Sequence, residues 1–309
     1  MRPTSLNCVY ELALKDERVV FIGSDLGPGL LEDFKTNLPD RYFMEGVAEQ
    51  HIVGMAAGLA LEGFIPYVNT IATFLTRRCF EQNVLDLGLH NTNVRLISNG
   101  GGTVYAPLGP THLAIDDIAI MRTIPNMTIV SPADADEMRR FMMQTLDHEG
   151  PIYIRLGKGY DPIVTTDDIP FEIGKGIPMK EGKDILIVTT GICLGIALEA
   201  AEILLEKKID ASVLHLHTIK PLDKEMLINM AKKVPAIISL EEHTIIGGLG
   251  SACAEVLLEE NFNEKKFFKR IGIPDVFPSG YGNQKDMMAR NGISAPHVVS
   301  TAMELVKKY

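Results

Sequence analysis

MEGVAEQHIVGMAAGLALEG, residues 44–63, is the most informative segment of this chain, because it combines an acidic start with an unusual density of small residues. From Ala48 onward its apolar residues repeat with the period of a helix. Gly54 and Gly58 fall inside that helix, where each glycine costs about 1 kcal/mol relative to alanine. The close approach of another backbone is the usual compensation, so we expect a tightly packed helix. Glu49 falls in its first turn, where unpaired amides and the helix dipole favour an acid.

Strand-like segments alternate with helical ones on both sides of this helix. Strands are predicted at residues 19–22, 64–69, 94–98, 127–130, 152–156, 185–189, 211–217, 236–240 and 267–273. Helices are predicted between them, and two of their starts are marked by a serine followed closely by a proline, which is typical of an N-cap and first turn. One of these helices is expected to begin at Ser131 and Pro132 and to run through residue 148. The other is expected to begin at Ser294.

This alternation predicts a fold of the α/β class, with two three-layer α/β/α domains whose sheets are mainly parallel. Residues 158–182 are rich in glycine, proline and charge and show little periodicity, so we interpret them as an interdomain linker. The first domain then spans residues 1–157 and the second spans residues 183–309. A chain of 309 residues is long enough for two cores of ordinary size.

Composition and charge argue against several classes of protein. The chain has 30 basic and 40 acidic residues and a formal net charge of −10, so no nucleic-acid partner is expected. No apolar run approaches the roughly 18 residues of a membrane span, and early charged residues argue against a signal peptide. The four cysteines lack the paired spacing of a disulfide framework or a zinc site. We therefore expect a cytoplasmic protein with no membrane partner and no metal site of its own.

The longer segment EGVAEQHIVGMAAGLALEGFIPYVNTIATFLTRR, residues 45–78, resembles the pyrimidine-binding domain of the transketolase family, whose members depend on thiamine diphosphate. The resemblance extends over nearly the whole chain. It implies that Glu49 is the catalytic acid that hydrogen-bonds the aminopyrimidine ring of the cofactor. It also implies that Phe74 stacks on this ring, and that Ile71, where many transketolases have an aromatic residue, forms an aliphatic wall. Asp25, in the motif GSDL, resembles an acid near the cofactor, although an aspartate is equally suited to a turn there.

The same family needs an anchor for the diphosphate and its metal ion. In the family this anchor is a GDG motif followed by an asparagine, and the sequence contains no GDG. The glycine cluster at residues 99–102 includes no acid that would bind a metal. The resemblance therefore implies the C-terminal part of a transketolase, encoded separately. A partner chain would hold the diphosphate and Mg²⁺ or a similar divalent ion, and we expect a heterotetramer with two copies of each chain (alpha2beta2).

Five further residues are expected to bind the substrate. His112, in GPTHLAIDD, stands where the family has a histidine that faces the substrate, and is a candidate for catalysis as well. Arg2 and Lys158 resemble, in position, the basic residues that hold a sugar phosphate. Gly100 and Leu108 stand where ordinary transketolases have polar groups that hydrogen-bond sugar hydroxyls. A site built to pair hydroxyls discriminates strongly, so these replacements predict a modified sugar rather than the usual pentose phosphates.

The leading hypothesis is a ketol transferase that moves a two-carbon unit from a ketose or ketose phosphate to an aldose, together with its partner chain. The beta subunit of a 2-oxo acid or acetoin dehydrogenase is an alternative, because it shares the EGVAE-type segment, and deoxyxylulose-phosphate synthase is another relative. A non-catalytic subunit is a further alternative. The retained acid Glu49 argues against it, because a carboxylate with no ligand to meet is costly at a packed interface.

Overall fold

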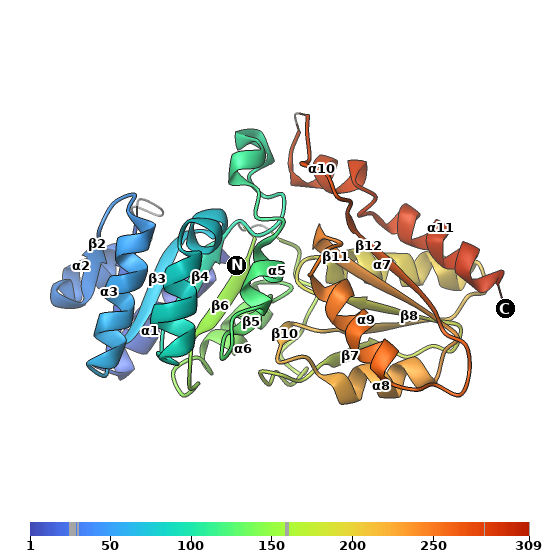
Figure 1. The fold of residues 1–309 in the computed structure, drawn as a ribbon, viewed down its shortest axis with the longest axis horizontal. Coiled ribbons are helices and arrows are strands. Elements are labelled where there is room, and N and C mark those ends of the chain that lie inside the picture. Colours follow the sequence, from blue (N-terminus) through green and yellow to red (C-terminus); the bar gives the residue numbers. More distant parts are fainter. Residues whose placement is uncertain (25–28, 30, 158–160, 281, 309) are drawn as a thin grey trace. The chain divides into compact units, whose positions relative to one another are not determined.

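The computed structural model describes residues 1–24, 29, 31–157, 161–280 and 282–308, which fall into two compact units (Figure 1). Unit 1 comprises Met1–Gly101 and Ile120–Ile173, and unit 2 comprises Gly102–Ala119 and Gly174–Tyr309. The short segment Gly102–Ala119 therefore belongs with the C-terminal half of the chain, although sequence order alone would place it in the N-terminal half.

Unit 1 is built on a parallel sheet. Its strands pair in the order β5 (Thr128–Val130), β6 (Ile152–Leu156), β4 (Arg95–Asn99), β3 (Ile65–Ile71), β1 (Val19–Gly23) and β2 (Tyr42–Met44), and each of these pairings is parallel. Strands β1, β4 and β6 are buried along their whole length, as expected for strands that are covered on both faces.

The described helical segments of unit 1 are α1 (Arg2–Lys15), α2 (Glu32–Asn37), α3 (Glu49–Leu61), α4 (Phe80–Gln82) and α6 (Ala135–Met142), with one 3₁₀ turn, Pro39–Arg41, and two π-helical segments, Phe74–Arg78 and Asn83–Leu89. Helix α5 (Asp117–Arg122) contains a boundary between the two units. Helix α3 is the small-residue helix that the sequence predicted, and it begins at the expected Glu49.

Unit 2 is built on a second, mainly parallel sheet. Its strands pair in the order β12 (Phe267–Ile273), β11 (Ala236–Thr244), β8 (Ile185–Thr189), β9 (Ala211–His215) and β7 (Ile177–Lys180). The pairings are parallel except that β7 is antiparallel to β9. The remaining elements are α7 (Cys193–Glu206), β10 (Thr218–Lys220), α8 (Lys224–Lys232), α9 (Leu249–Glu259), α10 (Gln284–Arg290) and α11 (Ala295–Val306).

The predicted fold class, two α/β domains with mainly parallel sheets, is confirmed. Part of the segment interpreted as a linker, Ile177–Lys180, forms strand β7, and the domain boundaries at residues 157 and 183 stay predictions. No helix within the described ranges is long and apolar enough to cross a membrane.

Helix α6 differs from its prediction at both ends. It begins at Ala135, after the N-cap Asp134, and ends at Met142, instead of running from Ser131 to residue 148. The Asp134 carboxylate accepts a hydrogen bond from the amide of Glu137 at 2.9 Å. The predicted start was therefore wrong, because a charged oxygen three residues further along provides the stronger cap.

A buried arginine fastens strand β4 to the loop that precedes β6. Arg95 is fully buried and donates hydrogen bonds to the backbone oxygens of Thr145, His148 and Gly150 at 2.8, 2.5 and 2.6 Å. Burial lowers the pKa of Arg95 to about 10. Burial, and secondarily the charge of Arg95, lowers the pKa of His148 to about 4. His148 is therefore neutral at physiological pH, and the buried positive charge of Arg95 lies beside a neutral imidazole.

Candidate functional site

Glu49 is the first residue of α3, and only 1% of its surface is exposed. Its predecessor Ala48 is the N-cap and provides no side-chain hydrogen bond, so the acid stands beside the unpaired amides of the first helical turn. Arg78 compensates its charge, because Nη1 of Arg78 donates a hydrogen bond to Oε2 of Glu49 at 2.5 Å. The arginine side chain is 42% exposed. The ion pair thus joins a buried acid to a base that reaches solvent.

Phe74 belongs to the same cluster. It begins the π-helical segment that Arg78 ends, and the guanidinium carbon of Arg78 lies 4.2 Å from the centroid of the Phe74 ring. Arg78 therefore contacts both residues that the sequence assigned to the cofactor ring, the acid and the aromatic. Sequence reasoning did not single out Arg78. The available signal was its spacing of four residues from Phe74, which places two side chains on one face of a helical segment.

Cys79 follows this cluster and is buried. Its thiol donates a hydrogen bond to the backbone oxygen of Phe74 at 3.2 Å. Burial, reinforced by the charge of Glu49, raises the pKa of the Cys79 thiol to about 12. The thiol is therefore protonated at physiological pH and is not a nucleophile.

The carboxyl ends of β3 and β4 carry a polar network that the sequence analysis missed. Asn99 Nδ2 donates to Asn69 Oδ1 at 2.7 Å and to Thr70 O at 3.0 Å, and the Ser24 hydroxyl donates to the Thr70 hydroxyl at 2.7 Å. Ile71, the predicted aliphatic wall, is the last residue of β3 and is half-buried. Ligands of parallel α/β sheets bind at this end of the strands, so Ile71 lies at the edge where a ligand is expected.

Two of the predicted substrate residues also lie in unit 1. Gly100 follows β4, is buried, and has a φ of +78°, a conformation that L side chains rarely adopt. The lack of a polar side chain at this position is therefore tied to the path of the backbone. Arg2 begins α1 and is half-buried, and its Nε is buried without a hydrogen-bond partner among the residues that the structure describes.

His112 and Leu108 lie in unit 2, on the segment Gly102–Ala119. His112 is half-buried, and its Nδ1 lies 2.9 Å from the Thr111 hydroxyl, while Leu108 is 55% exposed. The segment is fixed within unit 2 by Thr103, whose amide and hydroxyl donate to the buried carboxylate of Glu242 at 2.8 and 2.6 Å. The predicted site residues are thus divided between the units, and the structure brings Glu49 and Phe74 together within unit 1.

Two predicted residues, Asp25 and Lys158, lie outside the described residues. Within the described part of the chain, no group of three or more His, Cys, Asp or Glu side chains is placed to hold a metal ion. The expectation that this chain holds no metal stays a prediction.

Helix α3 is packed on one side and open on another. Ile52, Val53, Ala56 and Ala57 are buried. Gly58 is exposed, and a Cβ built on it would meet no described atom within 4 Å. The close backbone contact that we expected at Gly58 is therefore not made within the described part of this chain.

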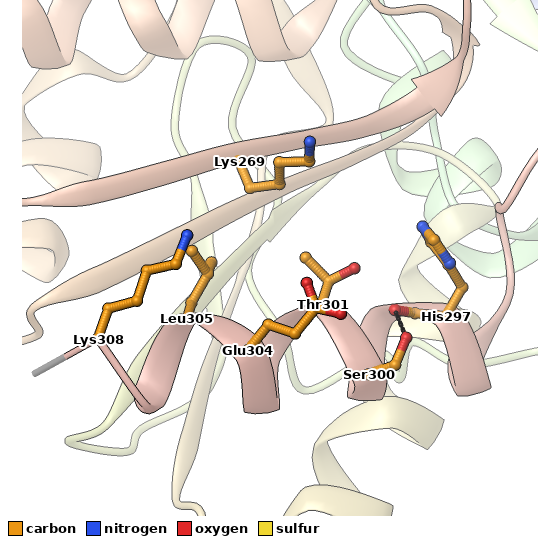
Figure 2. Close-up of a pocket in the computed structure, with 7 residues that line it drawn as sticks. All are labelled: Lys269, His297, Ser300, Thr301, Glu304, Leu305 and Lys308. Carbon is orange, nitrogen blue, oxygen red and sulfur yellow. Dashed lines mark hydrogen bonds between the residues drawn. The ribbon is translucent and has the colours of Figure 1, made fainter.

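A cavity of about 280 Å³ lies between β12 and α11 in unit 2 (Figure 2). Its lining carries charges of both signs and consists of Lys269, His297, Ser300, Thr301, Glu304, Leu305 and Lys308. Lys269 lies on β12, across the cavity from Glu304 and Lys308 (Figure 2), and none of the predicted site residues lines the cavity.

Two family models cover most of the chain. The model described as the pyrimidine-binding domain of transketolase matches residues 1–160, and the model described as the C-terminal domain of transketolase matches residues 174–298.

Individual relatives match over nearly their whole length. A 6-deoxy-6-sulfo-D-fructose transketolase subunit of Clostridium sp. (strain MSTE9) is 35% identical over 309 residues, which is 100% of this chain and 95% of that protein. One of the subunits of an apulose-4-phosphate transketolase, from Phocaeicola vulgatus, is 36% identical over 309 residues, which is 99% of this chain and 97% of that protein. A solved structure described as a split gene transketolase, inactive beta4 tetramer, is 37% identical with a TM-score of 0.90, covering 99% of this chain and 98% of that one.

Proposed function

The chain belongs to the transketolase family, and we propose that it is the separately encoded C-terminal subunit of a thiamine diphosphate-dependent, transketolase-like transferase. Such an enzyme transfers a two-carbon ketol unit from a ketose or ketose phosphate to an aldose. The observation that supports this most is that Glu49 and Phe74, the residues that the family resemblance assigns to the cofactor ring, both contact Arg78 in unit 1.

The residues present fit the pyrimidine half of the cofactor. A buried carboxylate whose partner is half-exposed can exchange that partner for a protonated ring nitrogen, and a neighbouring phenyl ring provides a stacking surface. Glu49 would hydrogen-bond the ring, Phe74 would stack on it, and Ile71 would form an apolar wall. When bound, thiamine diphosphate supplies the nucleophilic carbon for making and breaking carbon–carbon bonds beside a carbonyl.

The diphosphate half requires a second chain in this proposal. The sequence lacks the GDG motif, and the relatives are named as subunits of transketolases. The partner would be a diphosphate-domain subunit that holds the diphosphate and Mg²⁺ or a similar ion, in an alpha2beta2 assembly. Gly58 on α3, which nothing in the described chain covers, fits a surface that a second chain approaches closely.

A modified sugar is the proposed substrate. The two relatives are named for 6-deoxy-6-sulfo-D-fructose and for apulose 4-phosphate, which supports a departure from the usual pentose phosphates. Within this chain, Gly100 and Leu108 replace polar groups, and His112 would face the reacting carbons of the sugar. Burying an unpaired sugar hydroxyl against Leu108 costs on the order of 1–3 kcal/mol, which disfavours the usual substrates by about tenfold to a hundredfold.

Donor and acceptor profiling of the assembled enzyme tests this proposal. We expect transfer from 6-deoxy-6-sulfo-D-fructose or apulose 4-phosphate to exceed transfer from xylulose 5-phosphate to ribose 5-phosphate in kcat/KM. The variant Leu108→Asp should narrow this difference, because it restores a polar group beside the sugar. If the pentose phosphates are the best pair, the specificity argument is wrong. If only a 2-oxo acid serves as donor, the dehydrogenase and synthase alternatives replace the transferase.

A further inference from the structure

We propose that Arg78 holds the place of the cofactor's aminopyrimidine ring until the cofactor binds, and that it moves into solvent when the ring enters. This inference rests on the proposed function, because it assigns Glu49 and Phe74 to that ring. Arg78 is then a positioning residue: it keeps the carboxylate of Glu49 paired and correctly placed until the ring takes over the contact.

The two contacts of Arg78 are those expected of the ring. Its Nη1 donates a hydrogen bond to Glu49 Oε2 at 2.5 Å, and its guanidinium carbon lies 4.2 Å from the centre of the Phe74 ring. A guanidinium and an aminopyrimidine are both flat and both carry N–H groups in the plane of the molecule. Each can donate to an acid at its edge, the aminopyrimidine when its ring nitrogen is protonated, and each can stack on a phenyl ring with its face.

The burial of the two partners explains why such a substitute is needed. Glu49 is 1% exposed, and a buried carboxylate without a partner is strongly disfavoured. The thiol of Cys79 beside it stays protonated, because burial and the charge of Glu49 raise its pKa to about 12, so it adds no charge that would compensate the acid. Arg78 is the cation that makes a direct ion pair with Glu49 within the described part of the chain.

The exposure of Arg78 explains how the substitute is released. Its side chain is 42% exposed, so its charged group reaches water and loses little when the ion pair opens. The neighbouring Arg77 provides a contrast, because its Nη2 contacts the Thr73 hydroxyl at 3.4 Å and not Glu49. The two adjacent arginines have equal charge, and in this assignment only Arg78 competes with the cofactor.

Competition of this kind has a consequence for affinity. The measured dissociation constant of the cofactor includes the cost of displacing Arg78, so the variant Arg78→Ala should bind thiamine diphosphate more tightly than the wild type. For a half-exposed ion pair we expect a gain of about three- to tenfold. A residue that contacts the bound cofactor would have the opposite effect, because its loss would weaken binding.

Titration calorimetry on the assembled enzyme with excess Mg²⁺ measures this effect, and Arg77→Ala is the matched control. We expect tighter binding for Arg78→Ala and unchanged binding for Arg77→Ala. Low millimolar methylguanidinium should then weaken cofactor binding competitively in Arg78→Ala, because the free ion fills the vacated place, and should have little effect on the wild type. Weaker cofactor binding by Arg78→Ala, or no competition by methylguanidinium, would overturn the inference.

A second measurement uses the isolated chain and does not depend on the cofactor. Methylguanidinium should raise the Tm of Arg78→Ala relative to Arg77→Ala, and the double variant Arg78→Ala/Glu49→Gln should lose this difference. Arg78→Ser leaves the same place open and serves the same purpose if the alanine variant does not fold. An equal change in Tm on addition of methylguanidinium to Arg78→Ala and to Arg77→Ala would reject Arg78 as the substitute for the ring. By contrast, unchanged cofactor affinity in Glu49→Gln would reject the proposed role of Glu49 itself.

Discussion

His148 makes the stability of unit 1 depend on pH in a way that can be calculated. Its imidazole Nε2 lies 3.1 Å from the Thr128 hydroxyl, and its backbone oxygen accepts from the buried Arg95. Burial and the charge of Arg95 lower its pKa from the ordinary value of 6.5 to about 4. The folded state therefore binds this proton less readily than the unfolded state. Stability is fully present above pH 6.5 and is lost as the pH falls toward 4.

The size of this effect follows from the shift. A difference of 6.5 − 4, about 2.5 pKa units, corresponds to at most about 3 kcal/mol between neutral pH and pH 4, and partial exposure of the ring reduces it. Urea unfolding of the isolated chain at a series of pH values measures it. In His148→Gln the free energy of unfolding should change less between pH 6.5 and pH 4 than in the wild type. His90→Gln, at an exposed position of the same unit, should not reduce this change. If the free energy of unfolding falls equally steeply with pH in the wild type and in His148→Gln, the reasoning is refuted.

Three further substitutions test other parts of the structure. Glu49→Gln keeps the size of the side chain but removes the acid, so turnover of the assembled enzyme should fall by a factor of about 10² or more. The circular dichroism spectrum should stay the same as that of the wild type. Near-normal turnover would show that Glu49 has no part in the mechanism. Gly58→Leu should leave the Tm of the isolated chain unchanged, because a Cβ there meets no described atom within 4 Å, but it should disrupt assembly, as measured by light scattering. An intact complex would show that this helix face is not an interface. The carboxylate of Glu241 accepts hydrogen bonds from the amides of Leu249 and Gly250, at the start of α9, at 2.7 and 2.8 Å. Glu241→Gln should therefore lower the free energy of unfolding in urea by about 2 kcal/mol, because an amide side chain has only one acceptor oxygen. An unchanged free energy of unfolding would show that these two hydrogen bonds contribute nothing to stability.

Local sequence patterns were sufficient for most of the secondary structure. Strand β6 (Ile152–Leu156) and strand β8 (Ile185–Thr189) have the bounds that the sequence predicted and are buried along their whole length, and α3 begins at Glu49 as expected. The two strands are specified by residues adjacent in the sequence, since strands that are buried on both faces are near-continuous apolar runs. Helix α6 was predicted less well, because Ser131 and Asp134 are both acceptable caps and the hydrogen bond to Glu137 selects the second.

The arrangement of the site depends on contacts that no local pattern contains. The segment Gly102–Ala119 belongs to unit 2 because Thr103 bonds to Glu242, a residue 139 positions away in the chain. Glu49 and Phe74 could be named from the family resemblance, but their shared contact with Arg78 depends on where a π-helical segment ends. The resemblance therefore named Glu49 and Phe74 as candidates, and the structure was needed to find the arginine that contacts both.

The central claim is that this chain carries only one half of a cofactor site. Titration calorimetry with thiamine diphosphate and Mg²⁺ on the isolated chain, and then on the chain mixed with its diphosphate-domain partner, tests it most directly. We predict tight binding for the pair and no submicromolar binding for the isolated chain. Submicromolar binding by the isolated chain would contradict the claim.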